Sequence, residues 1–244
     1  MASIRKRKYG PNKDREAWVV DYVDQHGKRR LKTFPNKKSA EVWKVNALHE
    51  VRQGTHTPAS RWRSFIITAI FTGMRLGELR GLRWGDLDLD AGLIHVRQRA
   101  SQWMQIGPPK SKAGKRDIPL APIVVNTLRQ WRLVCPKGSL DLVFPNTIGH
   151  IDSVQGIHAR FWVPLQVKCG LTADTGKTRY SFHMLRHAAA SLFIKYLGWS
   201  PKRLQAVMGH ASISMTFDRY GHLFESAESD RADMEKIERA VRAS

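Results

Sequence analysis

The chain has few cysteines, no long apolar run and comparatively few acidic residues. Its two cysteines, Cys135 and Cys169, form no CxxC pair and no zinc-finger spacing, so neither a disulfide framework nor a zinc module is indicated. The apolar stretch FIITAIF is too short to span a bilayer, and no apolar segment follows the basic N-terminus as in a signal peptide. We therefore expect a soluble, cytoplasmic protein without a membrane partner.

The charge balance is strongly one-sided. Lys and Arg number 41 against 21 Asp and Glu, which is a formal net charge of +20. An excess of this size favours a polyanion as partner over a merely basic surface, and nucleic acid is the first candidate. With 244 residues, of which 42% are hydrophobic, the chain can bury a core as one large domain or two ordinary ones.

Residues 1–55 predict a small three-stranded sheet and one helix. The segments IRKRK, AWVVDYVD and RRLKTF are typical of strands, and QHGK supplies a turn between the last two. A helix is expected to end at Gly54, and its apolar face consists of Ala40, Trp43, Ala47 and Val51. Such a basic sheet can lie in a DNA groove, although solvated strand charges give the same pattern. The predicted DNA contacts are Arg5, Lys6, Arg7, Lys28, Arg29, Arg30 and Lys32.

Residues 56–61 have the composition of a linker, and residues 62–244 predict mostly helices. Strands are expected at LIHVRQRASQW and KRDIPL, around a Lys-rich loop, and one helix is expected from about Ser153 to Cys169. Gly73 and Gly198 should end helices, and Pro201 should open one. After about residue 225, the tail predicts an amphipathic helix. The expected fold class is α+β, with a mainly helical second domain that carries a small β-hairpin.

Two polar segments lie in the first half of this helical region. TGMRLGELRGL places Arg75 after a Gly turn and Glu78 three residues on, so the two share a helical face. Taken alone, this pattern favours a plain ion pair. PPKSKAGKRDIPL places four basic residues on a loop between strands, where most of the charges are expected to be solvated. These residues are Lys110, Lys112, Lys115 and Arg116.

Two further segments lie near the C-terminus. HMLRH places His183 three residues before Arg186 and four before His187. Histidines at this spacing can hold zinc, but no Glu follows His183 as in a zincin helix and no third ligand is evident. MGHASISMTFDRY contains His210 and Tyr220. Taken alone, this tyrosine is better explained as a packing ring.

Together these residue types are sufficient for phosphoryl transfer. Each guanidinium group can donate two parallel hydrogen bonds to a phosphate and keeps its charge. Arginine and histidine donors can stabilise the charge of a pentacoordinate transition state without a metal ion. A tyrosine can attack phosphorus as a covalent nucleophile while a lysine protonates the leaving oxygen. No metal or other cofactor is required.

The order of these motifs resembles that of the tyrosine recombinases of the phage integrase family, over roughly residues 62–225. TGMRLGELRGLRW is similar to the first box of the family. The resemblance implies that Arg75 is the first catalytic arginine and that Glu78 supports it. PPKSKAGKRDIPL is similar to the strand hairpin with the catalytic lysine. Lys110 matches that lysine best, and Lys112 is the alternative.

The two later boxes match as well. HMLRHAAASL is similar to the HxxR box, which assigns His183 and the second catalytic arginine, Arg186. MGHASISMTFDRY resembles the last box, which assigns His210 and the nucleophile, Tyr220. The resemblance implies a site-specific recombinase that cuts and rejoins double-stranded DNA through a 3′-phosphotyrosyl link. It also implies a homotetramer on attachment sites, DNA-bending accessory proteins and a bacterial or prophage setting at the nucleoid.

The front of the chain resembles, more loosely, the small arm-type DNA-binding domain of such integrases. Family members usually carry a helical core-binding domain and the first catalytic helix between that domain and the first arginine box, but here only GTHTPASRW stands there. We expect some uncovered apolar surface as a result. Two alternatives stay open: a catalytically impaired integrase remnant that binds DNA as a regulator, and a type IB topoisomerase, which would not need the front domain.

Overall fold

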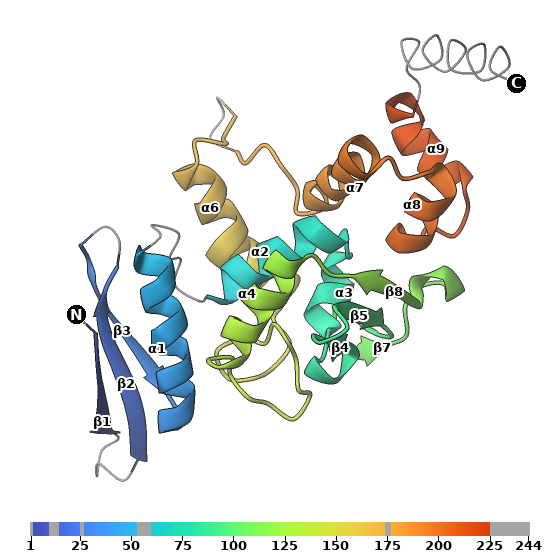
Figure 1. The fold of residues 1–244 in the computed structure, drawn as a ribbon. Helices are drawn as coiled ribbons and strands as arrows, with labels where there is room; N and C mark the ends of the chain where they lie inside the picture. Colours follow the sequence, from blue (N-terminus) through green and yellow to red (C-terminus); the bar gives the residue numbers. More distant parts are fainter. Residues whose placement is uncertain (1, 10–14, 25–26, 53–59, 174–176, 225–244) are drawn as a thin grey trace, which may run out of the picture.

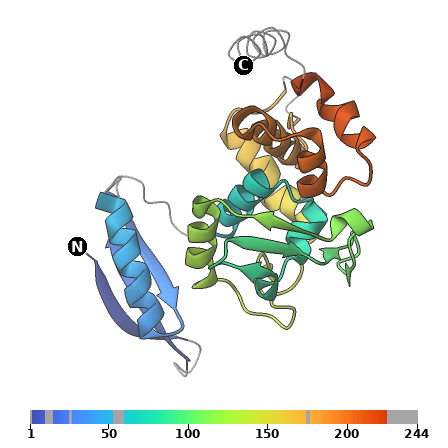
Figure 2. The ribbon, with the colours of Figure 1, turned by 45° about the vertical axis from the view of Figure 1, so that its right-hand side comes forward.

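The computed structural model describes residues 2–9, 15–24, 27–52, 60–173 and 177–224. The first part is an antiparallel sheet of β1 (Ser3–Tyr9), β2 (Arg15–Val23) and β3 (Arg29–Phe34), with β2 in the centre. Helix α1 (Lys37–Arg52) lies across one face of this sheet (Figures 1 and 2). The predicted sheet and helix are therefore confirmed.

The alternation of side chains explains why this small unit folds. Trp18, Val20 and Tyr22 point to the same side of β2, because successive residues of a strand face opposite sides. That side packs on α1, where Trp43 is 2% exposed and its ring centroid lies 5.1 Å from that of Tyr22. The predicted apolar face of the helix is the one that is buried. Leu133, from the second part of the chain, also packs against this cluster.

The second part begins with α2 (Arg61–Thr72) and α3 (Leu76–Gly81). Ser60 caps α2 by accepting a hydrogen bond from the Arg63 amide at 3.1 Å. Gly73 ends α2 with a φ of 62°, a left-handed conformation that favours glycine. The predicted break between two helices is confirmed.

Two small sheets and one helix follow. The elements are η1 (Trp84–Asp86), β4 (Leu87–Asp88), β5 (Leu93–Val96), β6 (Arg99–Ala100), β7 (Ile106–Gly107), η2 (Lys112–Gly114), β8 (Arg116–Pro119) and α4 (Pro122–Arg132). One sheet has the order β4-β5-β8, and the other pairs β6 with β7. The strand predicted over LIHVRQRASQW is thus two strands, because the pairing partner changes after Val96.

The helix predicted from Ser153 to Cys169 contains an irregular middle. It consists of α5 (Val154–Ile157), the π-helical segment η3 (His158–Trp162) and α6 (Val163–Lys168). Pro164 stands at the start of α6 and has no amide proton to donate to the preceding turn. This missing donor accounts for a change of hydrogen-bond pattern at that point.

The last described elements are α7 (Met184–Leu197), α8 (Pro201–Met208), α9 (Ser214–Tyr220) and η4 (Gly221–Leu223). Gly198 ends α7 and Pro201 opens α8, both as predicted. Buried residues form a large cluster around α2 and α4 and a smaller one under α7 and α8. None of the described helices could cross a membrane. The tail helix predicted after residue 225 lies outside the described residues, as does most of the predicted linker.

Candidate active site

Arg75 and Glu78 are coupled at the start of α3. The Arg75 amide donates to Glu78 Oε2 at 2.9 Å, and Arg75 Nη1 donates to Oε1 at 3.0 Å. Arg75 Nη2 donates to the carbonyl of Gly209 at 2.8 Å, across 134 residues of sequence. The predicted ion pair is present, and its arginine is also held to a distant segment near the C-terminus.

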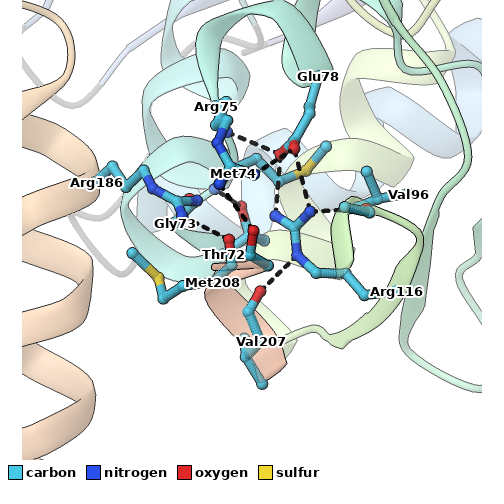
Figure 3. Close-up of polar contacts among 12 residues, drawn as sticks. Thr72, Gly73, Met74, Arg75, Glu78, Val96, Arg116, Arg186, Val207 and Met208 are labelled. Carbon is cyan, nitrogen blue, oxygen red and sulfur yellow. Dashed lines mark hydrogen bonds and ion pairs between the residues drawn. The ribbon is translucent and has the colours of Figure 1, made fainter. Parts of the chain in front are cut away.

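Arg116 completes a buried network around Glu78, which is 2% exposed (Figure 3). Its Nη1 and Nη2 atoms donate to the two carboxylate oxygens of Glu78 at 3.1 and 2.9 Å. Burial by itself raises the pKa of Glu78, but the hydrogen bonds and charges of Arg116 and Arg75 bring that pKa below its ordinary value. Most charges of this loop were expected to be solvated, and Arg116, which is 9% exposed, is an exception.

Arg186 reaches the same network from α7 (Figure 3). Its Nη1 donates to the carbonyl of Gly73 and its Nη2 to the carbonyl of Met208, both at 2.5 Å. Burial, followed by the positive charge of Arg75, lowers the pKa of Arg186 to about 9. The charge of Arg186 is thus disfavoured in a partly dry site, and a bound anion would stabilise it.

His210 lies just after α8 and is 5% exposed. Its Nδ1 atom is 2.9 Å from the hydroxyl of Thr216. Burial and the charge of Arg186 lower its pKa to about 4, so the ring is neutral near pH 7. Gly209 precedes it with a φ of 65°, and a Cβ there would lie 2.9 Å from the carbonyl oxygen of Ala113. A glycine is therefore needed where this chain segment approaches the lysine loop.

Tyr220 is both a core ring and a polar group. It is 4% exposed and belongs to the cluster under α7 and α8. Its hydroxyl oxygen lies 2.8 Å from Nδ1 of His187. Burial raises the pKa of the phenol. The two interpretations of this tyrosine are thus compatible, because the ring packs in the core while the hydroxyl is hydrogen-bonded on α7.

The remaining two predicted residues are exposed. His183 immediately precedes α7; although its side chain reaches solvent, surrounding protein partly desolvates the ring, and this desolvation, then the charge of His187, lowers its pKa to about 4. Lys110 lies in the loop before η2 and lines a pocket of about 540 Å³ together with Arg75 and Glu78. Lys112, the alternative, starts η2. Of the two lysines, Lys110 is the one that shares a pocket with the arginine network.

Three residues of this region were not assigned a role from the sequence. Arg116 could have been found, because it alternates with Ile118 along β8 and so belongs to the buried face of that strand. His187 was considered only as a zinc ligand, and Arg219 was not considered. In the described part of the chain, no group of three or more His, Cys, Asp or Glu residues could hold a metal ion.

The predicted DNA contacts of the front sheet do not share one face. Arg5, Arg7 and Arg29 pair with Val19, Ala17 and Val23 and lie on the side away from α1. Three further predicted contacts pair with residues that face α1, and these are Lys6, Arg30 and Lys32. Lys28 lies between β2 and β3.

The sheet's charges are also partly compensated by acids. Lys6 pairs with Glu16 at 2.7 Å, and Arg30 pairs with the buried Asp24 at 2.8 Å. On the outer face, Arg29 and Arg5 share one carboxylate, that of Asp21, at 2.5 and 3.8 Å. The face opposite α1 is therefore the more basic and more accessible part of the predicted surface, with Arg5 and Arg7 on it.

The arrangement brings a cluster of arginines close to a buried tyrosine, and comparison with known proteins assigns the family of the chain. The sequence model of the phage integrase family matches residues 43–227. The chain belongs to this family, and the predicted family is confirmed. The α+β class is also confirmed.

Individual relatives agree with this assignment. The chain is 32% identical to the tyrosine recombinase XerC of Xylella fastidiosa (strain 9a5c) over 178 residues, which is 72% of this chain and 54% of XerC. It is 26% identical to the prophage integrase IntR of Escherichia coli (strain K12) over 230 residues, 85% of this chain and 52% of IntR. The chain thus spans about half the length of these curated relatives.

A solved structure has the same fold. The Tn1549 transposon integrase (residues 82–397), in complex with circular intermediate DNA, superposes with a TM-score of 0.60 at 23% identity. The superposition covers 83% of this chain and 66% of that one. At this identity, the likeness concerns the fold.

Proposed function

We propose that this chain is a site-specific DNA recombinase that cuts and rejoins strands through a 3′-phosphotyrosyl intermediate. One observation carries the proposal. A single carboxylate, that of Glu78, is surrounded by three buried or half-buried guanidinium groups, which belong to Arg75, Arg116 and Arg186. Two positive charges are therefore left uncompensated among these four groups. A phosphodiester is an anion that two arginines can bind through paired hydrogen bonds.

In the proposed reaction, Arg75 and Arg186 hold the nonbridging oxygens of the phosphate. The hydroxyl oxygen of Tyr220 forms a bond to phosphorus, and the bond from phosphorus to the 5′ oxygen breaks. The phenolic proton passes to a neutral histidine, His183 or His210, and Lys110 gives a proton to the leaving 5′ oxygen. Attack by a 5′-hydroxyl of the partner duplex reverses these steps and rejoins the strands.

The geometry supports these roles to different degrees. Tyr220, His210 and both arginines come from segments that hydrogen bonds draw together at α3, α7 and the loop after α8. A neutral histidine can accept a proton, and the lowered pKa values of His183 and His210 favour that state. Glu78 acts by holding Arg75, not by touching DNA, because it is almost fully buried.

We further propose double-stranded DNA as the partner, with a homotetramer as the working unit. One protein of known structure with this fold is an integrase in complex with DNA, and a net charge of +20 favours such a partner. In this proposal, residues 1–55 form an arm-type DNA-binding domain and residues 62–244 the catalytic domain. The outer face of the front sheet, with Arg5, Arg7 and Arg29, would lie against the phosphates.

A trapping experiment tests the reaction. Duplexes that the protein enriches from a random pool would be nicked next to the bound site, so that a cut strand end diffuses away and the covalent adduct accumulates. We expect the wild-type chain to form the adduct, Tyr220→Phe to form none and Tyr196→Phe to behave as wild type, because Tyr196 is 70% exposed on α7. An adduct of equal yield with Tyr220→Phe would exclude this nucleophile.

The same set of samples separates the recombinase from a DNA-binding remnant. Specific binding without any adduct from the wild-type chain would favour the remnant. For the front sheet, a triple change of Arg5, Arg7 and Arg29 to Ala should reduce the slope of log affinity against log salt by about 0.9 for each phosphate that the protein no longer neutralises. The matched control changes three lysines on α1, which are the exposed Lys37 and Lys38 and the half-buried Lys44. Equal slopes for the two triple variants would contradict the assignment of the outer face.

A further inference from the structure

His187 contacts the reacting group of the proposed mechanism but has no role in it. It lies on α7, and its Nδ1 atom is 2.8 Å from the hydroxyl oxygen of Tyr220. This is hydrogen-bond distance, so either the ring donates to the phenol oxygen or it accepts the phenolic proton. The choice decides whether His187 stabilises negative charge on Tyr220 or acts as its base.

The contact on the other side of the ring settles the direction. Nη1 of Arg219, on α9, is 3.3 Å from Nε2 of His187. An arginine can only donate, so Nε2 must offer its lone pair. A neutral imidazole carries one proton, which then resides on Nδ1 and points to Tyr220. In this tautomer, His187 donates and the phenol oxygen accepts.

The charges around His187 favour the neutral ring over the imidazolium. Burial, then the charges of Arg219 and Arg186, lowers its pKa below the ordinary value. The neighbouring ring of His183, with its centroid 4.9 Å away, has a lowered pKa as well. Because Nε2 is engaged by Arg219 and Nδ1 already carries the proton, this neutral ring has no free lone pair facing Tyr220, and it can only donate to the phenol oxygen.

We propose that His187 is a further catalytic residue, which donates a hydrogen bond from Nδ1 to the Tyr220 oxygen and stabilises the negative charge that develops there. Arg219 is a positioning residue that selects this tautomer through Nε2. The inference rests on the proposed function. His187 keeps its proton throughout, and the phenolic proton goes to His183 or His210 as above. Because the phenolate is the leaving group in rejoining, the same donor should speed both directions.

Two substitutions of His187 distinguish a hydrogen-bond donor from a structural residue. Leu fills much of the space but cannot donate, whereas the Asn side-chain nitrogen can take nearly the position of Nδ1. We expect His187→Leu to slow adduct formation on the nicked duplex on the order of 10²-fold, as for the loss of one donor to a developing oxyanion. His187→Asn should be at least about tenfold faster than His187→Leu. Rejoining of the isolated adduct should slow by the same factors.

The role of Arg219 is tested through a double-mutant cycle. Arg219→Leu should slow the wild-type chain but should not slow His187→Leu further, because the two residues act through one hydrogen-bonded chain. DNA affinity and the thermal midpoint are measured for every variant, so that loss of binding or folding is recognised. Additive effects of the two substitutions would overturn the positioning role.

The outcomes for His187 are separate from those for the whole proposal. If the wild-type chain forms no adduct, the recombinase proposal fails and His187 loses its role with it. If the wild-type chain reacts and His187→Leu reacts at the same rate, only the role of His187 is overturned. If Leu and Asn variants are equally slow while both bind DNA normally, the side chain acts through packing and the donor role is also overturned.

Discussion

Replacing Glu78 by Gln removes the only carboxylate from the network of Arg75, Arg116 and Arg186 while leaving its volume almost unchanged. In the wild-type chain, this carboxylate accepts four hydrogen bonds, two from Arg75 and two from Arg116. Gln offers one oxygen, and its amide group would face guanidinium donors. The charge of Arg116, whose side chain is 6% exposed, would lose its ion-pair partner.

The expected loss is large because the network is buried. Removing one partner of a buried ion pair costs about 3–5 kcal/mol, out of a total stability of about 5–15 kcal/mol for an ordinary domain. With a urea dependence of about 1–3 kcal/mol per M, the unfolding midpoint should fall by roughly 1–5 M. The matched control is Asp90→Asn. It breaks a pair with Arg129 in which Asp90 is 97% exposed, and we expect no measurable shift.

Tryptophan fluorescence during urea unfolding measures this loss, and acid provides a second test. The pKa of Glu78 is lower in the folded chain, so its contribution is fully present above its ordinary pKa and is lost as pH falls through the lower, folded value. The stability difference between wild type and Glu78→Gln should therefore shrink as the pH falls below the ordinary pKa of a glutamate side chain. A loss at neutral pH below about 1 kcal/mol, as for a surface pair, would refute the reasoning.

Further predictions concern a turn, a buried histidine and the two cysteines. Gly209→Ala should lower the thermal midpoint more than Gly198→Ala, because both glycines have positive φ but only at position 209 would a Cβ meet backbone; equal losses would contradict this. By NMR, the His210 ring should not titrate between about pH 8 and about pH 5, since its pKa is near 4. A midpoint near the ordinary value would show an unburied ring. An alkylating reagent should modify the exposed Cys169 and spare Cys135, because burial raises the pKa of the Cys135 thiol to about 11. Peptide mass spectrometry would detect equal labelling of both, which would contradict that prediction.

Local elements could be predicted because their causes lie close together in sequence. The burial of Trp43 follows from helical spacing, and the ends of helices at Gly73 and Gly198 follow from backbone freedom at glycine. Pro201 opens α8 because the first turn of a helix offers its amides no acceptor within the helix, and proline has no amide proton that would need one. The interruption around residues 158–162 was not predicted, although Pro164 supplied a signal for it.

The site was predicted in its residue types but not in its contacts. Four sequence boxes were sufficient to select Arg75, Arg186, His210 and Tyr220, and hydrogen bonds across the fold link their segments. The burial of Arg116 was not predicted, because a charge on a Lys-rich loop is usually solvated and its partner lies 38 residues earlier in the chain. A sequence pattern of a few residues cannot indicate a partner that is 38 positions away.

The sequence by itself determined the family, the α+β class and most element boundaries, because periodicity, capping and motif order act within a few residues. Tertiary structure alone decided which charges are paired and that His187 holds the Tyr220 hydroxyl in place. Arg5 and Lys6 are neighbours in sequence but lie on opposite faces of a sheet, whereas Arg75 and the Gly209 carbonyl are 134 residues apart and in contact. The physical reason is that burial and partner choice depend on how distant segments close around each other, which no local stretch of sequence specifies.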